Sequence, residues 1–371
     1  MVLEKGRISI RQFTILVALY TIGTAILIIP SILAAKAHQD AWLSGILGLA
    51  CGLLMIYFYW KLSERFQYRN FVEILELCFG KVIGRTAAFL FFICYVLLLS
   101  TFVLRDIGDF MLTVMMVETP IEAIHIIFLT IVLYGVWLGL EVFTRTMELF
   151  LPFIVLLLIT LFITLLPQIE FANILPVLEN GIRPVLSSSF SFVVFPFLEM
   201  IVFLMIIPSV NTPEKTKKAF LLGTAIGGGL LVLLSALSIL VLGSIETARS
   251  IYPTYDLTKT INIREFFQRV EALMALIWFI TVFVKLVLLL YASCLAIAQV
   301  FQLQEYRILI LPVGLLLYVL SLSIFPSTSY LLEFTPVYNL YTVFWCLGLP
   351  AVVWVVSLLR GRQHGRINKD V

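Results

Sequence analysis

Charged residues are scarce in this chain of 371 residues, since Asp, Glu, Lys and Arg together make up only 13% of it. Hydrophobic residues make up 61%, and the mean hydropathy is +1.08. A chain this apolar, with many long apolar runs, cannot be a soluble domain and is typical of a polytopic membrane protein. The formal net charge is only +3 and is dispersed, so nothing indicates a nucleic-acid partner.

Residues that hold metals or perform covalent chemistry are equally few. The five cysteines are an odd number, lie mostly in apolar runs and form no CxxC pair, so we expect them to be core residues. His38, His125 and His364 are scattered and indicate no metal site, and we expect no cofactor. The sequence contains no nucleophile elbow, P-loop or HExxH motif. A membrane enzyme is therefore the least favoured class of function.

The apolar runs predict a single all-α transmembrane domain, residues 1–371, with ten spans. The run from Phe13 to Ala35 follows three basic residues, as in a signal peptide, but it exceeds an h-region of ~7–15 residues, so we expect an uncleaved first span. The predicted spans are approximately 11–35, 41–61, 83–105, 121–140, 144–166, 184–209, 218–244, 271–299, 307–325 and 337–359.

Positive charge is distributed unevenly between the two sides of this predicted bundle. An even number of spans places both termini on one side, and the segments on that side hold 17 of the 25 Lys and Arg residues. The positive-inside rule therefore predicts that both termini are cytoplasmic. Near the outer end of the third span, Arg105, Asp106 and Asp109 are expected to form a network at the outer surface.

Two segments outside the spans are predicted to be helical. Asn70–Phe79 has Asn70 as an N-cap and Gly80 as a stop, which is typical of a helix at the cytoplasmic interface. Residues 263–273, in the long outer loop, are expected to pack on the surface, although they could instead cap an outer vestibule.

The stretch Tyr20–Pro30 interrupts the first span. Thr21, Gly23 and Thr24 fall at its middle, and Pro30 follows within two turns. Backbone left unpaired at mid-membrane costs several kcal/mol unless it lines a cavity or is buried in protein, so this stretch indicates the site of a polar ligand. A small-residue face for close helix packing explains the same residues equally well.

The sixth span carries a matching interruption. The first and sixth spans begin about 173 residues apart, and the same offset carries Gly23 onto Pro196. Five spans precede Pro167 and five follow Pro184, and an odd number in each half requires the halves to be inverted in the membrane. We therefore predict a five-plus-five inverted repeat in which spans one and six are broken and bind a ligand between them. The two repeats would cover residues 11–166 and 184–360.

The broken spans are predicted to bind a zwitterion such as an α-amino acid, because half-helix N-termini attract an anion and half-helix C-termini a cation. The backbone at 23–25 would receive the carboxylate, and carbonyls near Thr21 and at 192–195 the ammonium. An apolar wall would favour a small or branched aliphatic side chain. The predicted ligand-binding residues are Thr21, Gly23, Thr24, Ala25, Leu98, Thr101, Phe192, Phe195, Phe197, Leu198 and Val284.

Two charged residues fall inside the spans near this site. Lys285 lies near the middle of span eight, where a charge is costly and usually functional. Its ammonium could take the place of a sodium ion between spans one and eight, bonded to span-one carbonyls, or it could form a structural ion pair with Glu199. Glu199 follows the break in span six by three residues and could bind the ligand ammonium or tie span six to a neighbour.

Several stretches together resemble one family. They are Ile8–Phe13 leading into Thr21–Pro30, then Phe195–Glu199, then Pro213–Ala219. The chain resembles, over nearly its whole length, the B subunits of spore-germination receptors (GerAB type), a branch of the amino acid, polyamine and organocation transporter superfamily. It departs from that pattern at Leu198, where a glycine is expected before the glutamate.

The resemblance implies a LeuT-like fold in the inner membrane of a bacterial endospore. There the B subunit would sense a nutrient, often an amino acid, beside an A subunit and a lipoprotein C subunit. An amino acid secondary transporter shares this fold and pocket, so analogy of fold does not separate the two functions. The lack of an evident acidic proton relay deep in the spans favours a receptor. Partner contacts are expected first at Lys215–Lys218 and at the 70–79 helix.

Overall fold

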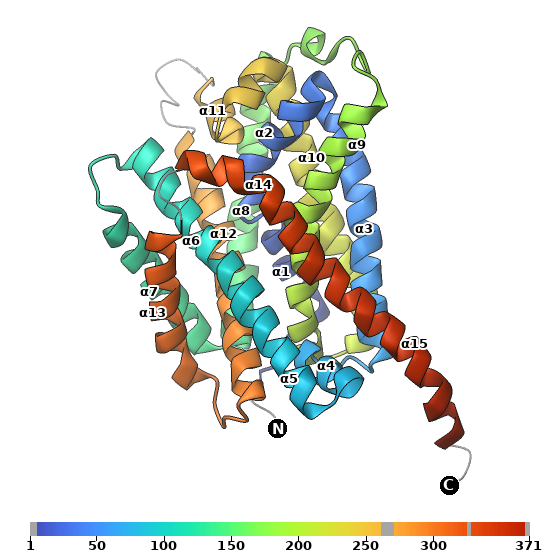
Figure 1. Cartoon of the computed structure of the whole chain (residues 1–371). Helices are drawn as coiled ribbons and strands as arrows, with labels where there is room; N and C mark the ends of the chain where they lie inside the picture. Colours follow the sequence, from blue (N-terminus) through green and yellow to red (C-terminus); the bar gives the residue numbers. More distant parts are fainter. Residues whose placement is uncertain (1–5, 261–270, 325–327, 368–371) are drawn as a thin grey trace.

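The computed structural model describes residues 6–260, 271–324 and 328–367, which form a bundle of helices (Figure 1). In these residues, eight helical stretches are long and apolar enough to cross a membrane. Two shorter apolar helices, Ile10–Ile22 and Arg307–Ser323, lie among them. The protein is therefore a multi-pass membrane protein, as its composition predicts.

Within the described ranges, the helices assemble into ten crossings. Crossings one to five are α1 (Ile10–Ile22) with α2 (Ala25–Ala37), α3 (Ala41–Arg65), α5 (Lys81–Leu90) with α6 (Leu98–Phe110), α7 (Ile121–Leu138) and α8 (Leu140–Leu165). Crossings six to ten are α9 (Ile182–Phe192) with the 3-10 helix Leu198–Met205, α10 (Thr216–Arg249), α12 (Glu271–Val300), α13 (Ile310–Ser323), and α14 (Thr328–Val343) with α15 (Leu349–Ile367). The prediction of ten spans is confirmed.

The largest boundary error concerns the third crossing, which continues as one helical stretch from Lys81 to Met115, well past the predicted end at residue 105. Arg105 and Asp109 therefore lie within the helix and form an ion pair of 2.9 Å whose side chains are buried. The prediction of an outer-surface network was wrong for this pair. The physical reason is that opposite charges four residues apart face each other on a helix, so the helix can carry both inward.

Two short helices lie outside the crossings. The predicted interfacial helix is present as α4 (Phe71–Phe79), which begins where the Asn70 side chain accepts a hydrogen bond of 3.0 Å from the Glu73 backbone N–H. It ends at Gly80, whose φ of +85° suits glycine. Helix α11 (Pro253–Lys259) lies in the loop between α10 and α12 and packs against α2, α10 and α12. The helix predicted at 263–273 falls almost entirely on residues 261–270, outside the described residues.

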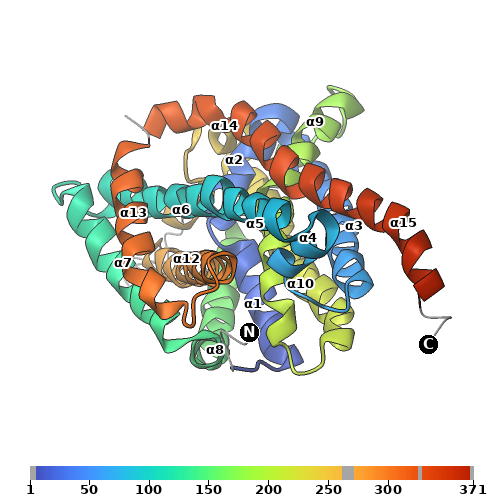
Figure 2. The same cartoon turned by 60° about the horizontal axis from the view of Figure 1, so that its bottom comes forward.

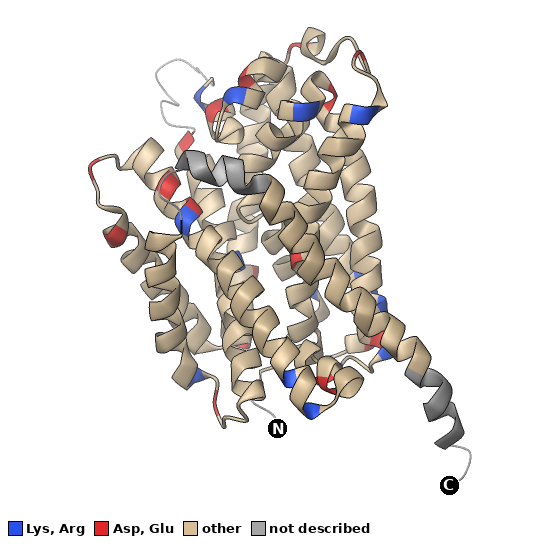
Figure 3. Ribbon diagram, viewed as in Figure 1, with Lys and Arg blue, Asp and Glu red and all other residues tan. Residues whose placement is uncertain are grey.

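The broken first crossing occupies the centre of the bundle. Helix α1 packs against α8, α10 and α12, which Figure 2 shows grouped around it. Charged residues gather toward the two ends of the bundle and are few at mid-height (Figure 3). The N-terminal end of the described chain and the end of α15 lie at the same end of the bundle (Figure 1).

A short backbone pairing links the start of crossing one to the end of crossing six. The Ile8 N–H donates to the Ser209 carbonyl at 3.0 Å, and the Asn211 N–H donates to the Ile8 carbonyl at 3.0 Å. The two broken crossings are thus joined at the end of the molecule where the chain begins.

Candidate functional site

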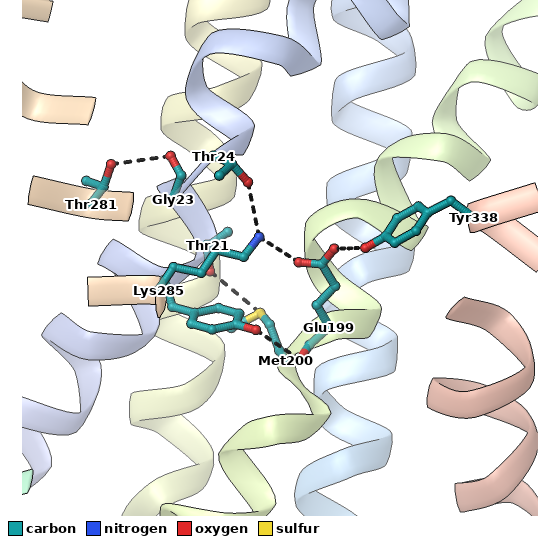
Figure 4. Close-up of polar contacts among 9 residues, drawn as sticks. Thr21, Gly23, Thr24, Glu199, Met200, Thr281, Lys285 and Tyr338 are labelled. Atoms are coloured by element: carbon teal, nitrogen blue, oxygen red, sulfur yellow. Dashed lines mark hydrogen bonds and ion pairs between the residues drawn. The ribbon is translucent and has the colours of Figure 1, made fainter. Parts of the chain in front are cut away.

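Crossing one breaks at Gly23, between α1 and α2. Gly23 has a φ of +26°, a backbone conformation that residues other than glycine rarely adopt. A Cβ atom there would lie 2.8 Å from both the Tyr20 carbonyl oxygen and Lys285 Cδ. The Gly23 carbonyl has left the helix and accepts a hydrogen bond of 3.3 Å from the Thr281 hydroxyl of α12 (Figure 4).

A second carbonyl in this crossing is released by Pro30. Proline has no N–H, so the carbonyl of Ile26, four residues earlier, lacks its helical donor. The hydroxyl of Thr254 on α11 donates to that carbonyl at 2.6 Å, and both groups are buried. Helix α11 is therefore attached to crossing one just beyond the break.

Crossing six breaks at Phe195, whose backbone is extended, with φ −122° and ψ 111°, between α9 and the 3-10 helix. The break falls one residue from Pro196, the position predicted from Gly23, so the prediction that both crossings are broken in register is confirmed. Carbonyls near the break bond to tyrosines. The hydroxyl of Tyr59 lies 3.0 Å from the Leu198 carbonyl oxygen, and that of Tyr20 donates to the Glu199 carbonyl at 3.3 Å.

Lys285 and Glu199 form an ion pair between the two breaks. Lys285 Nζ lies 2.7 Å from Glu199 Oε2 and 3.2 Å from the Thr24 hydroxyl, and both charged side chains are fully buried. Tyr338 of α14 donates to the other carboxylate oxygen of Glu199 (Figure 4). The ammonium also lies 4.7 Å from the centre of the Phe195 ring. One charge network thus joins crossings one, six, eight and ten.

The contacts of the Lys285 ammonium bear on both alternatives left open for this residue. The ammonium bonds to Glu199 and to the Thr24 side chain, and no span-one carbonyl in the described residues accepts from it. Lys285 and Glu199 are thus paired in this structure, and the contact of Lys285 with crossing one runs through the Thr24 hydroxyl group; the role of Lys285 stays a prediction. Glu199 contacts Lys285 of crossing eight and Tyr338 of crossing ten. Because a buried charge is tolerated only when paired, each member fixes the other in place.

Two of the three predicted phenylalanines, Phe192 and Phe197, lie on the side of crossing six that faces α3. Their ring centroids are 5.0 Å apart, and the rings pack against Gly48 and Gly52 of α3. A Cβ at Gly52 would lie 2.5 Å from the Phe197 ring, so the contact with α3 is close. Both rings therefore pack against α3 in the structure.

The other predicted residues are distributed over the helices around the break. The Thr21 hydroxyl donates to the Val17 carbonyl of its own helix at 2.8 Å. Thr101 on α6 likewise donates to the Leu97 carbonyl at 2.9 Å. Ala25, Leu198 and Val284 are buried, and Leu98 and Phe195 are half-buried.

Sequence reasoning missed Thr281 and Tyr338. Thr281 lies one turn before Lys285, so helical spacing alone places both on one face of α12, and this signal was available. Tyr338 follows Pro336 in the tenth crossing, and nothing in its sequence surroundings points to Glu199.

The polar groups of this network are closed off from solvent, because Thr24, Glu199 and Lys285 are almost completely buried. In the described residues, no group of three or more His, Cys, Asp or Glu side chains is placed to hold a metal ion.

Solved structures show the class of fold. The nucleobase-cation-symport-1 family transporter MHP1, in a closed conformation with bromovinylhydantoin bound, matches with a TM-score of 0.72 and 12% identity over 96% of this chain and 80% of its own. A manganese transporter of Eremococcus coleocola matches with a TM-score of 0.56 and 11% identity, covering 93% of this chain and 74% of its own. The protein thus has the LeuT-type fold that its resemblance to the receptor subunits implies, with crossings one and six broken.

Sequence relatives define the family. Spore germination protein KB of Bacillus subtilis (strain 168) is 33% identical over 330 residues, 88% of this chain and 87% of the relative. Spore germination protein YndE of the same organism is 26% identical over 307 residues, 80% of this chain and 82% of the relative. The family described as "Spore germination protein" matches residues 7–329. The chain belongs to that family, and its resemblance to germination-receptor B subunits is confirmed.

Proposed function

We propose that this protein is a germinant-receptor subunit that binds a small aliphatic amino acid at the breaks of crossings one and six. It would signal germination together with an A subunit and a lipoprotein C subunit in the spore inner membrane, with both termini in the cytoplasm. The observation that carries the proposal is the position of the Lys285 ammonium. This alkylammonium group, held by Glu199 and Thr24 between the two breaks, occupies the kind of site that an amino acid's own ammonium would need.

An amino acid can enter by inserting into the ion pair. Its ammonium would take the contact with Glu199, while its carboxylate would take the freed ammonium of Lys285. The first N–H groups of α2 add to the carboxylate site, because Thr24 makes no side-chain cap with them. Two charge contacts would then replace one. A conformational response follows if the ligand binds this opened arrangement more tightly than the closed one.

Selection among amino acids would depend on the apolar side chains beside the pair. Phe195 lies against the Lys285 ammonium, and Leu98 and Val284 lie on the flanking crossings, so these remain our predicted contacts for the ligand side chain. A charged side chain would have to give up its hydration in this setting, which disfavours it. We therefore expect alanine or leucine to bind more tightly than glutamate.

Reconstitution tests the proposal and separates it from transport. Purified protein in liposomes is incubated with labelled alanine, leucine and glutamate, with and without an ion gradient. A receptor binds an aliphatic amino acid without accumulating it, whereas accumulation driven by the gradient would identify a transporter. A preference for glutamate would refute the predicted selectivity.

A matched pair of glutamate variants makes the binding measurement specific. Glu199→Gln removes the charge that would receive the ligand ammonium and should abolish binding. Glu246→Gln, at a glutamate whose side chain is 68% exposed on α10, should leave binding unchanged. Equal binding by both variants would contradict the proposed role of Glu199.

A further inference from the structure

An apolar groove lies on the outer side of α3 and α10, two helices that pack together on one flank of the bundle (Figures 1 and 2). It has a volume of about 580 Å³ and is bordered by bulky side chains, of which Leu54 is 64% and Leu222 55% exposed. The groove therefore opens sideways, toward the lipid. Its lining residues are Leu53, Leu54, Tyr57, Lys217, Leu221, Leu222 and Ala225.

Lys217 places a positive charge at one end of this groove. Its ammonium lies 4.8 Å from the centre of the Tyr57 ring and 5.0 Å from that of Trp60, and cation–π attraction holds it there. Within the described part of the chain, Lys217 takes part in no ion pair. The nearby Lys61, by contrast, is 2.5 Å from the Glu64 carboxylate. The groove thus ends at an ammonium group whose charge is not balanced by a carboxylate.

We propose that the groove binds an anionic phospholipid, with an acyl chain along Leu54 and Leu222 and the head-group phosphate against Lys217. Basic pockets between membrane helices attract such head groups, and tyrosine and tryptophan are the aromatic residues enriched at this depth. A partner helix fits the lining less well. Helix interfaces in membranes favour small residues, whereas Ala225 is the single small side chain in the lining of this groove.

The bound lipid would contact α10, the helix that also packs against the broken first crossing. On its inner face α10 meets α1 closely, because a Cβ at Gly223 would lie 2.6 Å from the Thr14 carbonyl oxygen and one at Gly227 would lie 2.7 Å from the Ala18 carbonyl oxygen. Lipid on the outer face and α1 on the inner face would thus contact opposite sides of the same helix. This places the lipid where it can stabilise the packing of crossing one.

The test uses the full-length protein purified in detergent and compares three probes by native mass spectrometry and thermal unfolding. These are phosphatidylglycerol, phosphatidylcholine with the same acyl chains, and glycerophosphoglycerol, which is the head group without chains. Phosphatidylglycerol should bind and raise the melting temperature, while the other two should do so much less. Equal effects of phosphatidylglycerol and phosphatidylcholine would overturn the proposal, and so would binding of glycerophosphoglycerol as tight as that of the whole lipid.

Variants locate the effect in this groove. Lys217→Ala should weaken phosphatidylglycerol binding about fivefold, the factor expected for one lysine at a membrane surface. Lys218→Ala, at the exposed next position of α10, should leave it unchanged. Ala225→Phe fills the groove and should lower binding while the charge of Lys217 remains.

The outcome of these variants is decisive even if one of them is unstable. The melting temperature without added lipid shows whether Ala225→Phe is folded, and if it is not, the Lys217 and Lys218 comparison decides alone. Equal affinities of the Lys217→Ala and Lys218→Ala variants would refute the site. A photo-crosslinker at residue 222 should capture lipid, and capture of a partner membrane helix in its place would also refute it.

Discussion

Removing one member of the Lys285–Glu199 pair leaves the other charge alone inside the membrane. The two groups are 2.7 Å apart and fully buried, so neither can reach water. Breaking a buried pair by removing one partner typically costs about 3–5 kcal/mol, whereas replacing both partners with apolar residues is often neutral or stabilising by ~1–4 kcal/mol. We therefore expect Lys285→Met and Glu199→Leu each to lower the free energy of unfolding by several kcal/mol, and the double variant to regain most of the loss.

Binding should follow a different pattern from stability. A zwitterion that inserts into the pair needs both charges, so both single variants and the double variant should lose the amino acid response. The double variant is the informative one, since it should be well folded and still unable to bind. A stable double variant that binds the ligand normally would refute the insertion mechanism.

The assay combines thermal unfolding in detergent with equilibrium binding of a labelled amino acid. The exposed pair Lys61–Glu64 is a matched control, because its groups are 2.5 Å apart but their side chains are 45% and 37% exposed. Its single variants should change stability by only about 0–1 kcal/mol. If Lys285→Met cost no more than Lys61→Met, the buried pair would not have the energetic role that its burial implies.

Two further substitutions test how the broken crossings are supported. Thr254→Val should leave the Ile26 carbonyl without a donor and lower stability by about 1–3 kcal/mol, which thermal unfolding would detect. Gly52→Ala places a methyl group 2.5 Å from the Phe197 ring and should cost about 1–3 kcal/mol in the same measurement, whereas Gly229→Ala, with nothing within 4 Å, should be tolerated.

A control variant gives, for each of these two predictions, the result that would contradict it. Thr258 also bonds through its hydroxyl, but to the Tyr255 carbonyl of its own helix. A loss on Thr254→Val no larger than that on Thr258→Val would show that the bond from α11 to crossing one contributes little. Equal stability of the Gly52→Ala and Gly229→Ala variants would mean that α3 and crossing six can separate without cost.

The two breaks could be predicted because glycine and proline act on their own backbone. Gly23 tolerates a positive φ, and Pro196 cannot continue a helix, so each leaves a local signal in the sequence. The offset between the halves then placed the second break to within one residue of Phe195. The resemblance to the family was also visible from the sequence, because it rests on local stretches that include Thr21–Pro30 and Phe195–Glu199.

Side-chain partners could not be predicted in the same way, because they depend on how helices far apart in the sequence face each other. Phe192 is predicted at the ligand site through its backbone carbonyl and Phe197 through its side chain; the rings of both pack against α3, and their place in the site stays a prediction. The glycines at positions 48 and 52, four residues apart, mark that packing face in retrospect. Tyr338 reaches Glu199 only through the path of the tenth crossing, which no local pattern encodes.

The length of the third crossing was misjudged for a related reason. A search for apolar runs stops at charged residues, and Arg105 and Asp109 lie where the predicted span ends. Their ion pair within one helix turn neutralises both charges, so the helix continues to Met115. The division into repeats at 11–166 and 184–360 remains a prediction.

The backbone pairing of Ile8 with Ser209 and Asn211 links α1 to the 3-10 helix Leu198–Met205, so we expect these two half-crossings to move together. We expect a rearrangement that separates the interruptions to pivot about this joint, so that the far half, where Thr254 reaches Ile26, travels most. Locking residues 8 and 210 together with a disulfide should leave the proposed ligand response intact, whereas locking residues 26 and 254 together should arrest it. Comparing the two locked proteins would show at which end the molecule opens.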